Sequence, residues 1–325
     1  MAAIEVNNLV KFYTIFKKQP GFLGTLQSFF ARKYEKVKAV DDISFKIKDG
    51  ELVGFIGPNG AGKTTTLKCL SGLLYPTSGD ISVLGYKPAE RKYDFLKNIA
   101  FVMGAKNQLW WDLPPTDTFL LNKEIYEIDD HTYHKTLREL VDLLDVADVL
   151  KIQVKRLSLG QRMKCELIAN LLHQPKILFL DEPTIGLDVV MQNNLREFIR
   201  QYNQRFNSTI ILTSHYMQDV AALAKRVIII SNGKILFDGL LSRLVKKHAP
   251  YKLLSIVLKE PIDQKRLAKF GKIKSYQYPK LILRVSTKNS NKIAAQILSD
   301  LPVEDLNIED ADVEEVIREV FQTKK

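Results

Sequence analysis

A glycine-rich segment in the first fifth of the chain constrains the fold more than any other feature. It reads GPNGAGKTTTLKCL from Gly57 and follows an apolar strand at residues 52–56. The segment fits the pattern G-x-x-x-x-G-K-[ST] and continues with the apolar spacing of a helix. A strand, a glycine-rich turn and a helix in this order predict an α/β fold with a phosphate-binding loop.

The residue types of this loop match the chemistry of a nucleoside triphosphate. Glycines let the backbone bend until its N–H groups converge on phosphate oxygens, and the helix N-terminus adds partial positive charge. We expect Lys63 to reach the β- and γ-phosphates and the Thr64 hydroxyl to ligate Mg²⁺. The residues expected to bind the nucleotide here are Gly57, Pro58, Asn59, Gly60, Ala61, Gly62, Lys63, Thr64 and Thr65.

A second apolar strand, residues 177–180, ends in two adjacent carboxylates within KILFLDEPTIGLD. Sites in open α/β sheets form at such strand ends. We expect Asp181 to be a Mg²⁺ partner and Glu182 to be the general base that polarises the attacking water. Two acids after an isolated strand would also fit a solvated turn. The phosphate loop in the same chain favours the catalytic interpretation.

The stretch RLSLGQRMKCELIANLLHQP, just before the second strand, predicts a helix. Ser158 is placed as its N-cap, and the helix should stop before Pro175. Its N-terminus offers a further position that favours an anion.

These three segments together resemble an ATP-binding cassette (ABC) ATPase, the nucleotide-hydrolysing subunit of a transporter superfamily. The resemblance covers roughly residues 1–240 and implies a P-loop NTPase fold, with a RecA-like core and a helical subdomain. It also implies that two cassettes face each other, the LSLGQ signature of one closing over ATP held by the other. Leu159 stands where the family more often has glycine. Ser158, Gly160 and Gln161 would then contact the partner's ATP.

The resemblance assigns roles to residues outside these segments. Tyr13 would stack on adenine, although an ordinary tyrosine at a strand end is the alternative. His215, within IILTSHYMQDV, would contact the γ-phosphate as a switch residue. Residues 186–188 would contact the partner cassette. The implied catalytic set is Glu182, His215 and Lys63, with ATP and Mg²⁺ as cofactors.

One expected residue is missing from the stretch VMGAKNQLWWDLPP. The family has a glutamine after this strand that touches Mg²⁺ and the attacking water, and its spacing falls on Gly104 or Ala105. Gln108 lies three residues further on. Either Gln108 substitutes through a different loop path, or the loop serves mainly as a mechanical link and Glu182 and His215 hold the water.

Trp110 and Trp111 in the same stretch are the only tryptophans of the 325-residue chain. A rigid aromatic pair before two prolines would suit a hot spot for a partner helix. The alternative is that one or both pack under the helical subdomain. The stretch QLWWDLP, with the long insertion before AVDDIS, resembles a prokaryotic exporter-type (ABC-2-like) subgroup that works with separate membrane permeases.

The net charge of +11 is partly localised, because residues 14–38 are strongly basic. Within them an amphipathic helix is expected, which would rest on the membrane or permease or cover the cassette's own sheet; its apolar residues are Phe22, Leu23, Leu26, Phe29 and Phe30. No nucleic-acid-binding motif, signal peptide or long apolar run is recognised. We expect a peripheral protein on the cytoplasmic face of the cell membrane, with no nucleic-acid partner.

The domain boundaries expected are 1–244 for the cassette, with its helical subdomain at about 105–172, and 250–325 for an accessory domain. VKKHAP should be a linker. The accessory domain should contain strands 253–258, 273–277, 281–286 and 303–308, helices 262–270 and 291–298, and a last helix from about 312. The order βαββαβ predicts a small ferredoxin-like α+β fold. A dimer-stabilising or regulatory role is expected, and a ligand sensor is the sharper alternative.

The resulting hypothesis is a Mg-dependent ATPase that pairs with an identical or different second cassette and drives the permease of an exporter. Two rivals remain. One is a soluble cassette acting on ribosomes or DNA, and the other is a degenerate cassette that binds ATP and regulates without much hydrolysis.

Overall fold

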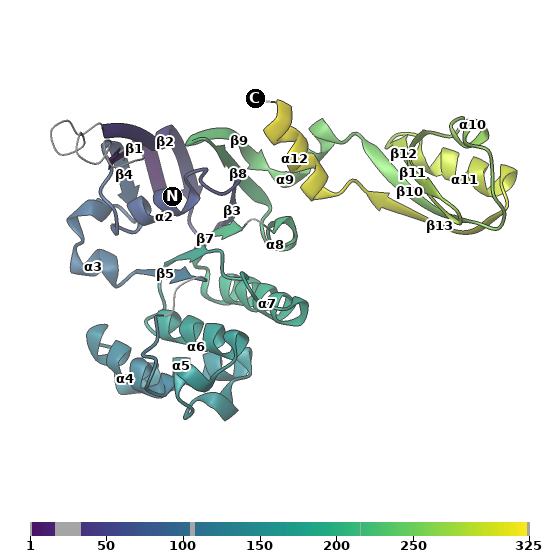
Figure 1. Cartoon of the computed structure of the whole chain (residues 1–325). Helices are drawn as coiled ribbons and strands as arrows, with labels where there is room; N and C mark the ends of the chain where they lie inside the picture. Colours follow the sequence, from purple (N-terminus) through teal and green to yellow (C-terminus); the bar gives the residue numbers. More distant parts are fainter. Residues whose placement is uncertain (1, 17–33, 105–107, 215, 324–325) are drawn as a thin grey trace, which may run out of the picture. The chain divides into compact units, whose positions relative to one another are not determined.

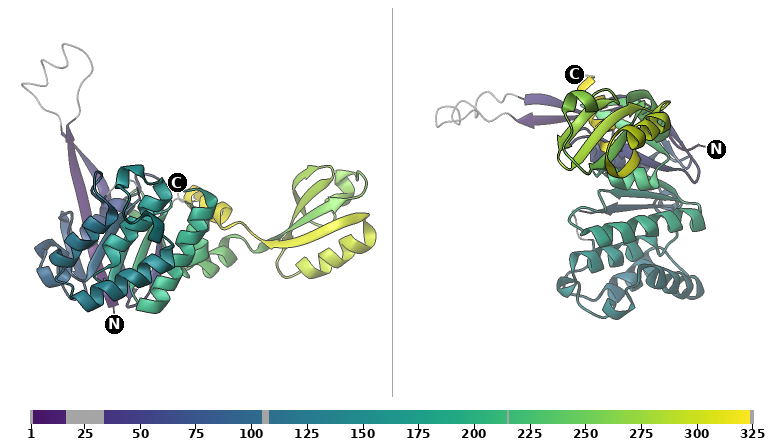
Figure 2. Two further views of the ribbon diagram at one scale, coloured as in Figure 1. Left: turned by 90° about the horizontal axis from the view of Figure 1, so that it is seen from below. Right: turned by 90° about the vertical axis from the view of Figure 1, so that its right-hand side faces the viewer.

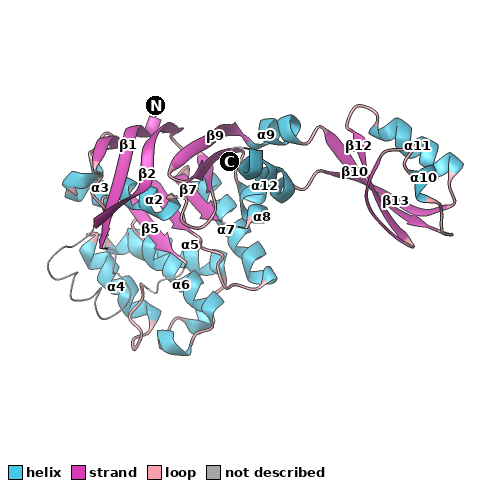
Figure 3. Cartoon of the chain, turned by 45° about the horizontal axis from the view of Figure 1, so that its top comes forward, coloured by secondary structure: helices cyan, strands magenta, loops and turns pink. Residues whose placement is uncertain are grey.

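The chain divides into two compact units in the computed structural model, Met1–Gly239 and Leu240–Lys325. The structure describes residues 2–16, 34–104, 108–214 and 216–323. Each unit is described by itself. Figure 1 shows the elements along the chain, and Figure 3 distinguishes helices from strands.

The first unit alternates strands and helices, as its sequence predicts. Its strands are β1 (Ala2–Phe16), β2 (Tyr34–Lys48), β3 (Leu52–Ile56), β4 (Ser78–Val83), β5 (Ile99–Met103), β6 (Ile177–Asp181), β7 (Thr209–Ser214), β8 (Arg226–Ser231) and β9 (Lys234–Leu240). Its helices are α2 (Lys63–Leu70), α3 (Tyr93–Leu96), α4 (Pro115–Ile125), α5 (Asp130–Leu144), α6 (Leu159–Leu171), α7 (Val189–Phe206) and α8 (Met217–Leu223). Three short 3₁₀ turns, Pro88–Glu90, Ala147–Val149 and Val154–Arg156, join them.

The central sheet has the order β5-β6-β7-β3-β8-β9, and the four pairs from β5 to β8 are parallel. Strands buried on both faces are continuous apolar runs, and β3, β6 and β7 have that character. The strand β3 lies next to β7 and β8 although it comes far earlier in the sequence, so the ends of β6, β7 and β3 lie side by side. The turns that follow these three strands are therefore at one edge of the sheet.

A second, antiparallel sheet has the order β2-β1-β4. Strands β1 and β2 form a long hairpin whose register runs to Phe16 opposite Tyr34. The expected amphipathic helix with Phe22 to Phe30 lies in residues 17–33, outside the described residues. Apolar side chains of this sheet pack with β3 and α2 into one core. Helices α4 to α7 pack with side chains of β5, β6 and β7 into a second core.

Helices α4, α5 and α6 fall within the range expected for the helical subdomain. In α5 the side chains of Tyr133, Leu140, Val141 and Leu144 are buried. Asp129 caps α5 by accepting a hydrogen bond from the Thr132 N–H at 2.9 Å. Figure 2 shows these helices grouped together at the end of the unit away from the β1–β2 hairpin.

The second unit contains a four-stranded antiparallel sheet of order β11-β12-β10-β13. Its elements are α9 (Leu241–His248), β10 (Tyr251–Leu258), α10 (Gln264–Leu267), β11 (Lys272–Gln277), β12 (Lys280–Ser286), α11 (Ser290–Asp300), β13 (Val303–Asp310) and α12 (Val313–Thr323). The two central strands are the first and third of the domain, with the second and fourth at the edges. This βαββαβ sheet is the ferredoxin-like arrangement that the sequence predicts.

Three local expectations are wrong. Residues predicted as a linker after Leu244 continue helix α9 to His248, because Leu241 and Leu244 are buried and α9 packs against α12. The division between the units accordingly falls after Gly239 rather than at residue 244. The helix expected at 262–270 is reduced to α10, which begins after the Asp263 cap.

Candidate functional site

The candidate site lies where β3, β6 and β7 end next to one another. The glycine-rich loop follows β3, Asp181 ends β6 and Ser214 ends β7. The β6–β7 pairing sets Asp181 opposite Thr213, and the β3–β7 pairing sets Ile56 opposite Ser214. The sheet therefore brings together segments that are more than a hundred residues apart in sequence.

The loop from Gly57 to Gly62 needs glycine at particular positions. Gly62, the N-cap of α2, has φ 108°, and a Cβ there would collide with the carbonyl oxygen of Ala39. A Cβ at Gly57 would likewise collide with the Ile230 carbonyl oxygen. Gly60, at φ 79°, has no atom within 4 Å of the place where a Cβ would stand. Strand packing thus explains two of the glycines, and backbone conformation explains the third.

Lys63 begins α2 and folds back over the loop. Its side chain is only 5% exposed, and Nζ donates to the Gly57 carbonyl at 2.7 Å and to the Pro58 carbonyl at 3.3 Å. Burial lowers the pKa of Lys63, while the charges of Glu182 and Asp181 act in the opposite direction. Backbone dipoles and two carboxylates therefore hold a cation inside the loop, the position expected for a phosphate-binding lysine.

Thr64, Asp181 and Thr213 form one hydrogen-bonded group. The Thr64 hydroxyl donates to Asp181 Oδ2 at 2.8 Å, and the Thr213 hydroxyl donates to Asp181 Oδ1 at 2.7 Å. The structure thus brings together the two residues that the sequence predicts as metal partners. Hydroxyl and carboxylate oxygens are ligands that suit Mg²⁺. The donor set fits a magnesium ion shared with a bound phosphate.

Glu182 follows β6 in the left-handed backbone region, at φ 53°. Its N–H donates to Thr213, at 3.1 Å from both the carbonyl oxygen and Oγ1. The side chain is 23% exposed, and Oε1 lies 3.7 Å from Lys63 Nζ. A positive φ is uncommon for a non-glycine residue and is found at functional sites. Thr213 therefore fixes the backbone from which the predicted general base projects.

Tyr13 lies on β1 opposite Val37 of β2, with its side chain 39% exposed. Two residues along β2, the Ala39 carbonyl contacts Gly62 of the loop. The Lys11 ammonium lies 5.5 Å from the centre of the Tyr13 ring. An exposed aromatic ring therefore lies on β1, which pairs with the strand β2 that adjoins the phosphate loop. The predicted switch residue His215 lies outside the described residues.

The signature segment has the cap that its sequence predicts. Ser158 Oγ accepts from the Gln161 N–H at 3.2 Å, and Gln161 Oε1 accepts from the Ser158 N–H at 3.0 Å. Helix α6, which Ser158 begins, lies away from α2 in Figure 1. Gly160 is packed against Met191 of α7, where a Cβ would come within 2.7 Å of the methionine methyl group. The signature and the phosphate loop are therefore separate parts of this unit.

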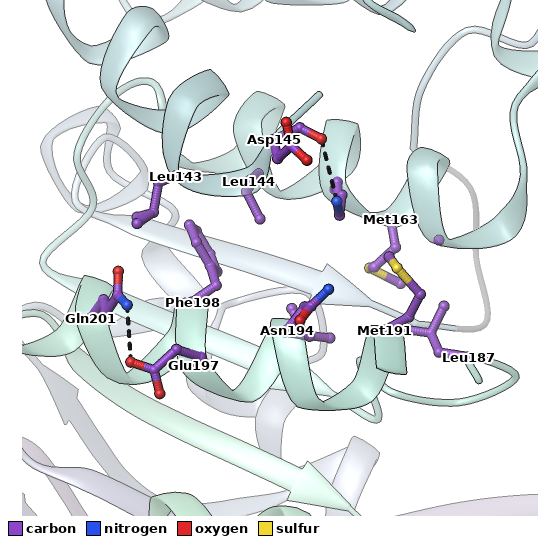
Figure 4. Close-up of a pocket in the computed structure, with 13 residues that line it drawn as sticks. Leu143, Leu144, Asp145, Met163, Leu187, Met191, Asn194, Glu197, Phe198 and Gln201 are labelled. Carbon is purple, nitrogen blue, oxygen red and sulfur yellow. Dashed lines mark hydrogen bonds between the residues drawn. The ribbon is translucent and has the colours of Figure 1, made fainter. Parts of the chain in front are cut away.

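Figure 4 shows a pocket between α5, α6 and α7, beside the signature. Its lining is mixed: Leu143, Met163, Leu187, Met191 and Phe198 are apolar, and Asp145, Lys164, Asn194, Glu197 and Gln201 are polar. Both Gly160 of the signature and Leu187 of the segment after Glu182 line the pocket. It shares only Gly160 with the residues expected to contact ATP, so it is distinct from the phosphate loop.

Gln108 does not reach the carboxylates of the site. Its side-chain NH₂ donates to the Phe101 carbonyl at 2.9 Å, and its side-chain oxygen accepts from Asn170 at 2.7 Å. A side chain at position 104 is also excluded, because a Cβ on Gly104 would collide with the Glu182 carbonyl oxygen. Ala105, the other expected position, lies outside the described residues. These contacts favour the interpretation of the loop as a mechanical link.

Both tryptophans are exposed, Trp110 at 55% and Trp111 at 48%. The Arg162 guanidinium lies 5.5 Å from the centre of the Trp111 ring. A neighbouring groove is lined by Leu73, Tyr93, Phe101, Met103, Gln108, Ile125, Tyr126 and Asn170, among others. Both tryptophans are therefore exposed, and Gln108, two residues before Trp110, lines this groove.

Two residues of the site were missed by sequence reasoning. Thr213 bonds both Asp181 and the Glu182 backbone, and Asp219, fully buried, accepts hydrogen bonds from Thr184, Arg196 and Ser214. Asp219 therefore connects Thr184, in the segment after Glu182, with Ser214, the residue before His215. The sequence did contain an indication for Thr213, because this residue lies at the end of an apolar strand that runs parallel to β6. Asp219 had none, because a lone acid in a helix resembles a surface residue.

Comparison with known proteins identifies the family. The ABC transporter family model matches residues 40–185, and a model for the EvrA-like ABC transporter C-terminal domain matches residues 250–309. The chain is 34% identical over 215 residues to the ABC transporter ATP-binding protein NatA of Bacillus subtilis, covering 66% of this chain and 87% of NatA.

The chain belongs to the ATP-binding subunits of ABC transporters. A second relative is the bacitracin transport ATP-binding protein BcrA of Bacillus licheniformis, 32% identical, with 68% of this chain and 71% of BcrA covered. Among solved structures, an ATP-binding subunit of an ABC transporter matches at a TM-score of 0.62 and 24% identity, covering 75% of this chain and 92% of that one.

A dimeric cassette bound to ADP and phosphate matches at a TM-score of 0.60 and 21% identity, with 73% of this chain and 98% of that chain covered. These structures confirm the fold, a P-loop cassette with an inserted helical region. Within the described residues of this ABC subunit, no helix has the length and apolar character needed to span a bilayer.

Proposed function

We propose that this ABC subunit is a Mg²⁺-dependent ATPase that drives a separate membrane permease. The observation that carries the proposal is the grouping of Lys63, Thr64, Asp181 and Glu182 at adjoining strand ends. Phosphoryl transfer to water depends mainly on positioning and on stabilisation of charge, and this group contains the charges for both.

Each residue has a role in the proposed reaction. The loop amides and Lys63 would bind the phosphates, and Thr64 and Asp181 would hold Mg²⁺, which neutralises phosphate charge when bound. Glu182 would accept a proton from the attacking water. Thr213 keeps Asp181 and the Glu182 backbone in place through its two hydrogen bonds. His215 and Tyr13 keep the roles that the family resemblance implies.

We further propose that two cassettes close around two ATP molecules. Ser158 lies in the helical part of the unit, away from its own phosphate loop, so it would complete the site of a second cassette. Its N–H and hydroxyl are already fixed by the capping box, which leaves a preorganised helix N-terminus toward an anion. The dimeric state of a structural relative supports this arrangement. The C-terminal unit would stabilise the pair.

The permease is proposed to dock on the surface that carries Trp110, Trp111 and the neighbouring groove. Exposed aromatic side chains next to an apolar groove are typical of interaction hot spots. Docking there would hold the subunit at the cytoplasmic face of the membrane. We propose export, because relatives include a linearmycin resistance ATP-binding protein of Bacillus subtilis, 32% identical with 64% of this chain and 66% of that protein covered.

Gentle detergent extraction of membranes tests the partner. Tagged wild-type protein should co-purify with a multi-span membrane protein, and Trp110→Ala/Trp111→Ala should lose it. Tyr278→Ala/Leu298→Ala is the matched control, since it removes similarly exposed side chains, 49% and 57% exposed, from the C-terminal unit. Purification of ribosomal or other soluble partners alone would contradict the transporter assignment.

A further inference from the structure

A polar cluster lies at the junction of β5 and α6 within the first unit. Glu166, on α6, is 2% exposed, and its Oε1 accepts from the Gln108 N–H at 3.2 Å. Asn170, one turn further along α6, donates both to the Gln108 side-chain oxygen at 2.7 Å and to the Glu166 carbonyl at 2.9 Å. Gln108 in turn donates to the Phe101 carbonyl on β5 at 2.9 Å. Three polar side chains thus connect the strand, the end of the loop and the helix.

The carboxyl of Glu166 is an unusual group for this position. Its neighbours Cys165, Leu167 and Ile168 are buried apolar residues. Burial raises the pKa of Glu166 to about 7, and the hydrogen bond from Gln108 and the charge of Arg162 act in the opposite direction. An apolar residue of the same size would avoid the desolvation of a carboxyl. Burial therefore destabilises the ionised form of the Glu166 side chain. The hydrogen bond from the Gln108 N–H acts against that effect.

The cluster stands between the reacting end of the sheet and the signature helix. The Gly104 N–H donates to the Asp181 carbonyl at 3.0 Å, so the connection after β5 starts at the carboxylates of the site. At its other described end, Gln108 is bound to Glu166 on α6. That helix begins at Ser158, the residue expected to meet the ATP of a second cassette. Gln108 and Asn170 also line the groove proposed for the permease.

We propose that Glu166 is a positioning residue, whose carboxyl holds the Gln108 N–H and so sets helix α6 and its Ser158 end relative to the strand ends of β5 and β6. The proposal rests on the proposed ATPase function of the paired cassettes. In this proposal Glu166 contacts neither the nucleotide nor the attacking water. It acts through Gln108 and α6, which must keep a fixed relation to the carboxylates when a second cassette closes.

Hydrogen exchange tests the contact without nucleotide. In the full-length chain, Glu166→Leu removes the acceptor while keeping an apolar side chain of similar size, and Glu166→Gln retains an acceptor oxygen. Exchange in the peptide that contains Gln108 should rise at least fivefold in Glu166→Leu and stay near wild type in Glu166→Gln. Met163→Leu, a buried packing change on the same helix, should leave that peptide unchanged. Unchanged exchange in Glu166→Leu would overturn the proposal.

ATP turnover then separates positioning from general stability. Glu166→Leu should lower kcat about fivefold or more with KM for ATP within about twofold, and Glu166→Gln should restore kcat. Exchange that rises throughout the cassette, or equal loss of kcat in Glu166→Gln, would show a merely structural or charge-dependent effect and overturn the assignment. Glu166→Met replaces the leucine variant if that protein does not fold. A wild type without ATPase activity would refute the proposed function, while the exchange result would still decide the Gln108 contact.

Discussion

The Thr64 hydroxyl donates to both carboxylate oxygens of Asp181, at 2.8 Å from Oδ2 and 3.0 Å from Oδ1. This contact joins the first turn of α2 to the end of β6, across 117 residues of sequence. The neighbouring Glu182 and Lys63 then lie 3.7 Å apart, between Oε1 and Nζ. The phosphate loop and the carboxylates therefore form one site before any second cassette is considered.

Glu182→Gln should lower ATP turnover at least about 100-fold, a rise of about 2.7 kcal/mol in the barrier. The amide keeps the size of the side chain but cannot accept the proton of water. Binding of a fluorescent ATP analogue should remain within about threefold of wild type. Glu90→Gln, which changes an exposed carboxylate paired with Lys92, is the control and should behave as wild type. Persistent hydrolysis in Glu182→Gln would place the base elsewhere.

Lys63→Met should weaken ATP binding at least about tenfold, or about 1.4 kcal/mol. The variant removes the one ammonium that the loop carbonyls of Gly57 and Pro58 hold in place. Equilibrium titration with a fluorescent nucleotide measures the effect. Lys68→Met, in the last turn of the same helix, controls for the loss of a positive charge on α2. Equal affinities of the two variants would be inconsistent with the assigned role of Lys63.

Gln108→Ala should lower ATP turnover by less than about tenfold. The Gln108 amide is directed toward Phe101 and Asn170 rather than toward Asp181 and Glu182. The backbone N–H that Glu166 accepts is retained in this variant. Steady-state phosphate release measures the effect, with Gln201→Ala, at an exposed position of α7, as the control. A loss of tenfold or more would show that Gln108 does take the place of the missing loop glutamine.

His173 should make the free energy of unfolding depend on pH in the acid range. The ring stacks on Tyr126 at 3.9 Å, its Nε2 bonds the Ile99 carbonyl at 3.0 Å, and burial lowers its pKa from 6.5 to about 4. Between these two values the unfolded chain binds a proton that the folded chain does not. The contribution is therefore present above pH 6.5 and is lost as the pH falls toward 4.

Urea unfolding from pH 8 to pH 4.5 checks this dependence. Wild type should lose about 2 kcal/mol more stability over the range than His173→Gln, which cannot take up the proton. The exposed His131→Gln should follow the wild-type curve. Parallel curves of unfolding free energy against pH for wild type and His173→Gln would contradict the burial of His173 as a neutral imidazole beside Tyr126 and Ile99.

Sequence reasoning located the residues that local pattern determines. The loop glycines, the two acids after an apolar strand and the Ser158 cap all depend on spacing within one short segment. Their positions in the structure follow because parallel strands bring their carboxyl ends to one edge. The βαββαβ order of the C-terminal unit was also predictable, because each of its elements follows from the apolar pattern of one short segment.

The features that the sequence did not indicate depend on contacts between distant segments. The burial of Glu166 cannot be seen in a helix whose polar residues normally face solvent, and Asp219 is buried only because Arg196 and Thr184 meet it. The basic run after Leu244 resembles a loop until α12 covers α9. The direction of the Gln108 side chain is set by Asn170, 62 residues away.

Phosphate release from ATP by the purified full-length chain, with and without Mg²⁺, tests the central claim most directly. We expect release that requires Mg²⁺, stops on chelation, and increases when the permease is present. The absence of Mg²⁺-dependent release, even with the co-purified permease in membranes, would contradict the ATPase account and favour a cassette that binds ATP without hydrolysing it.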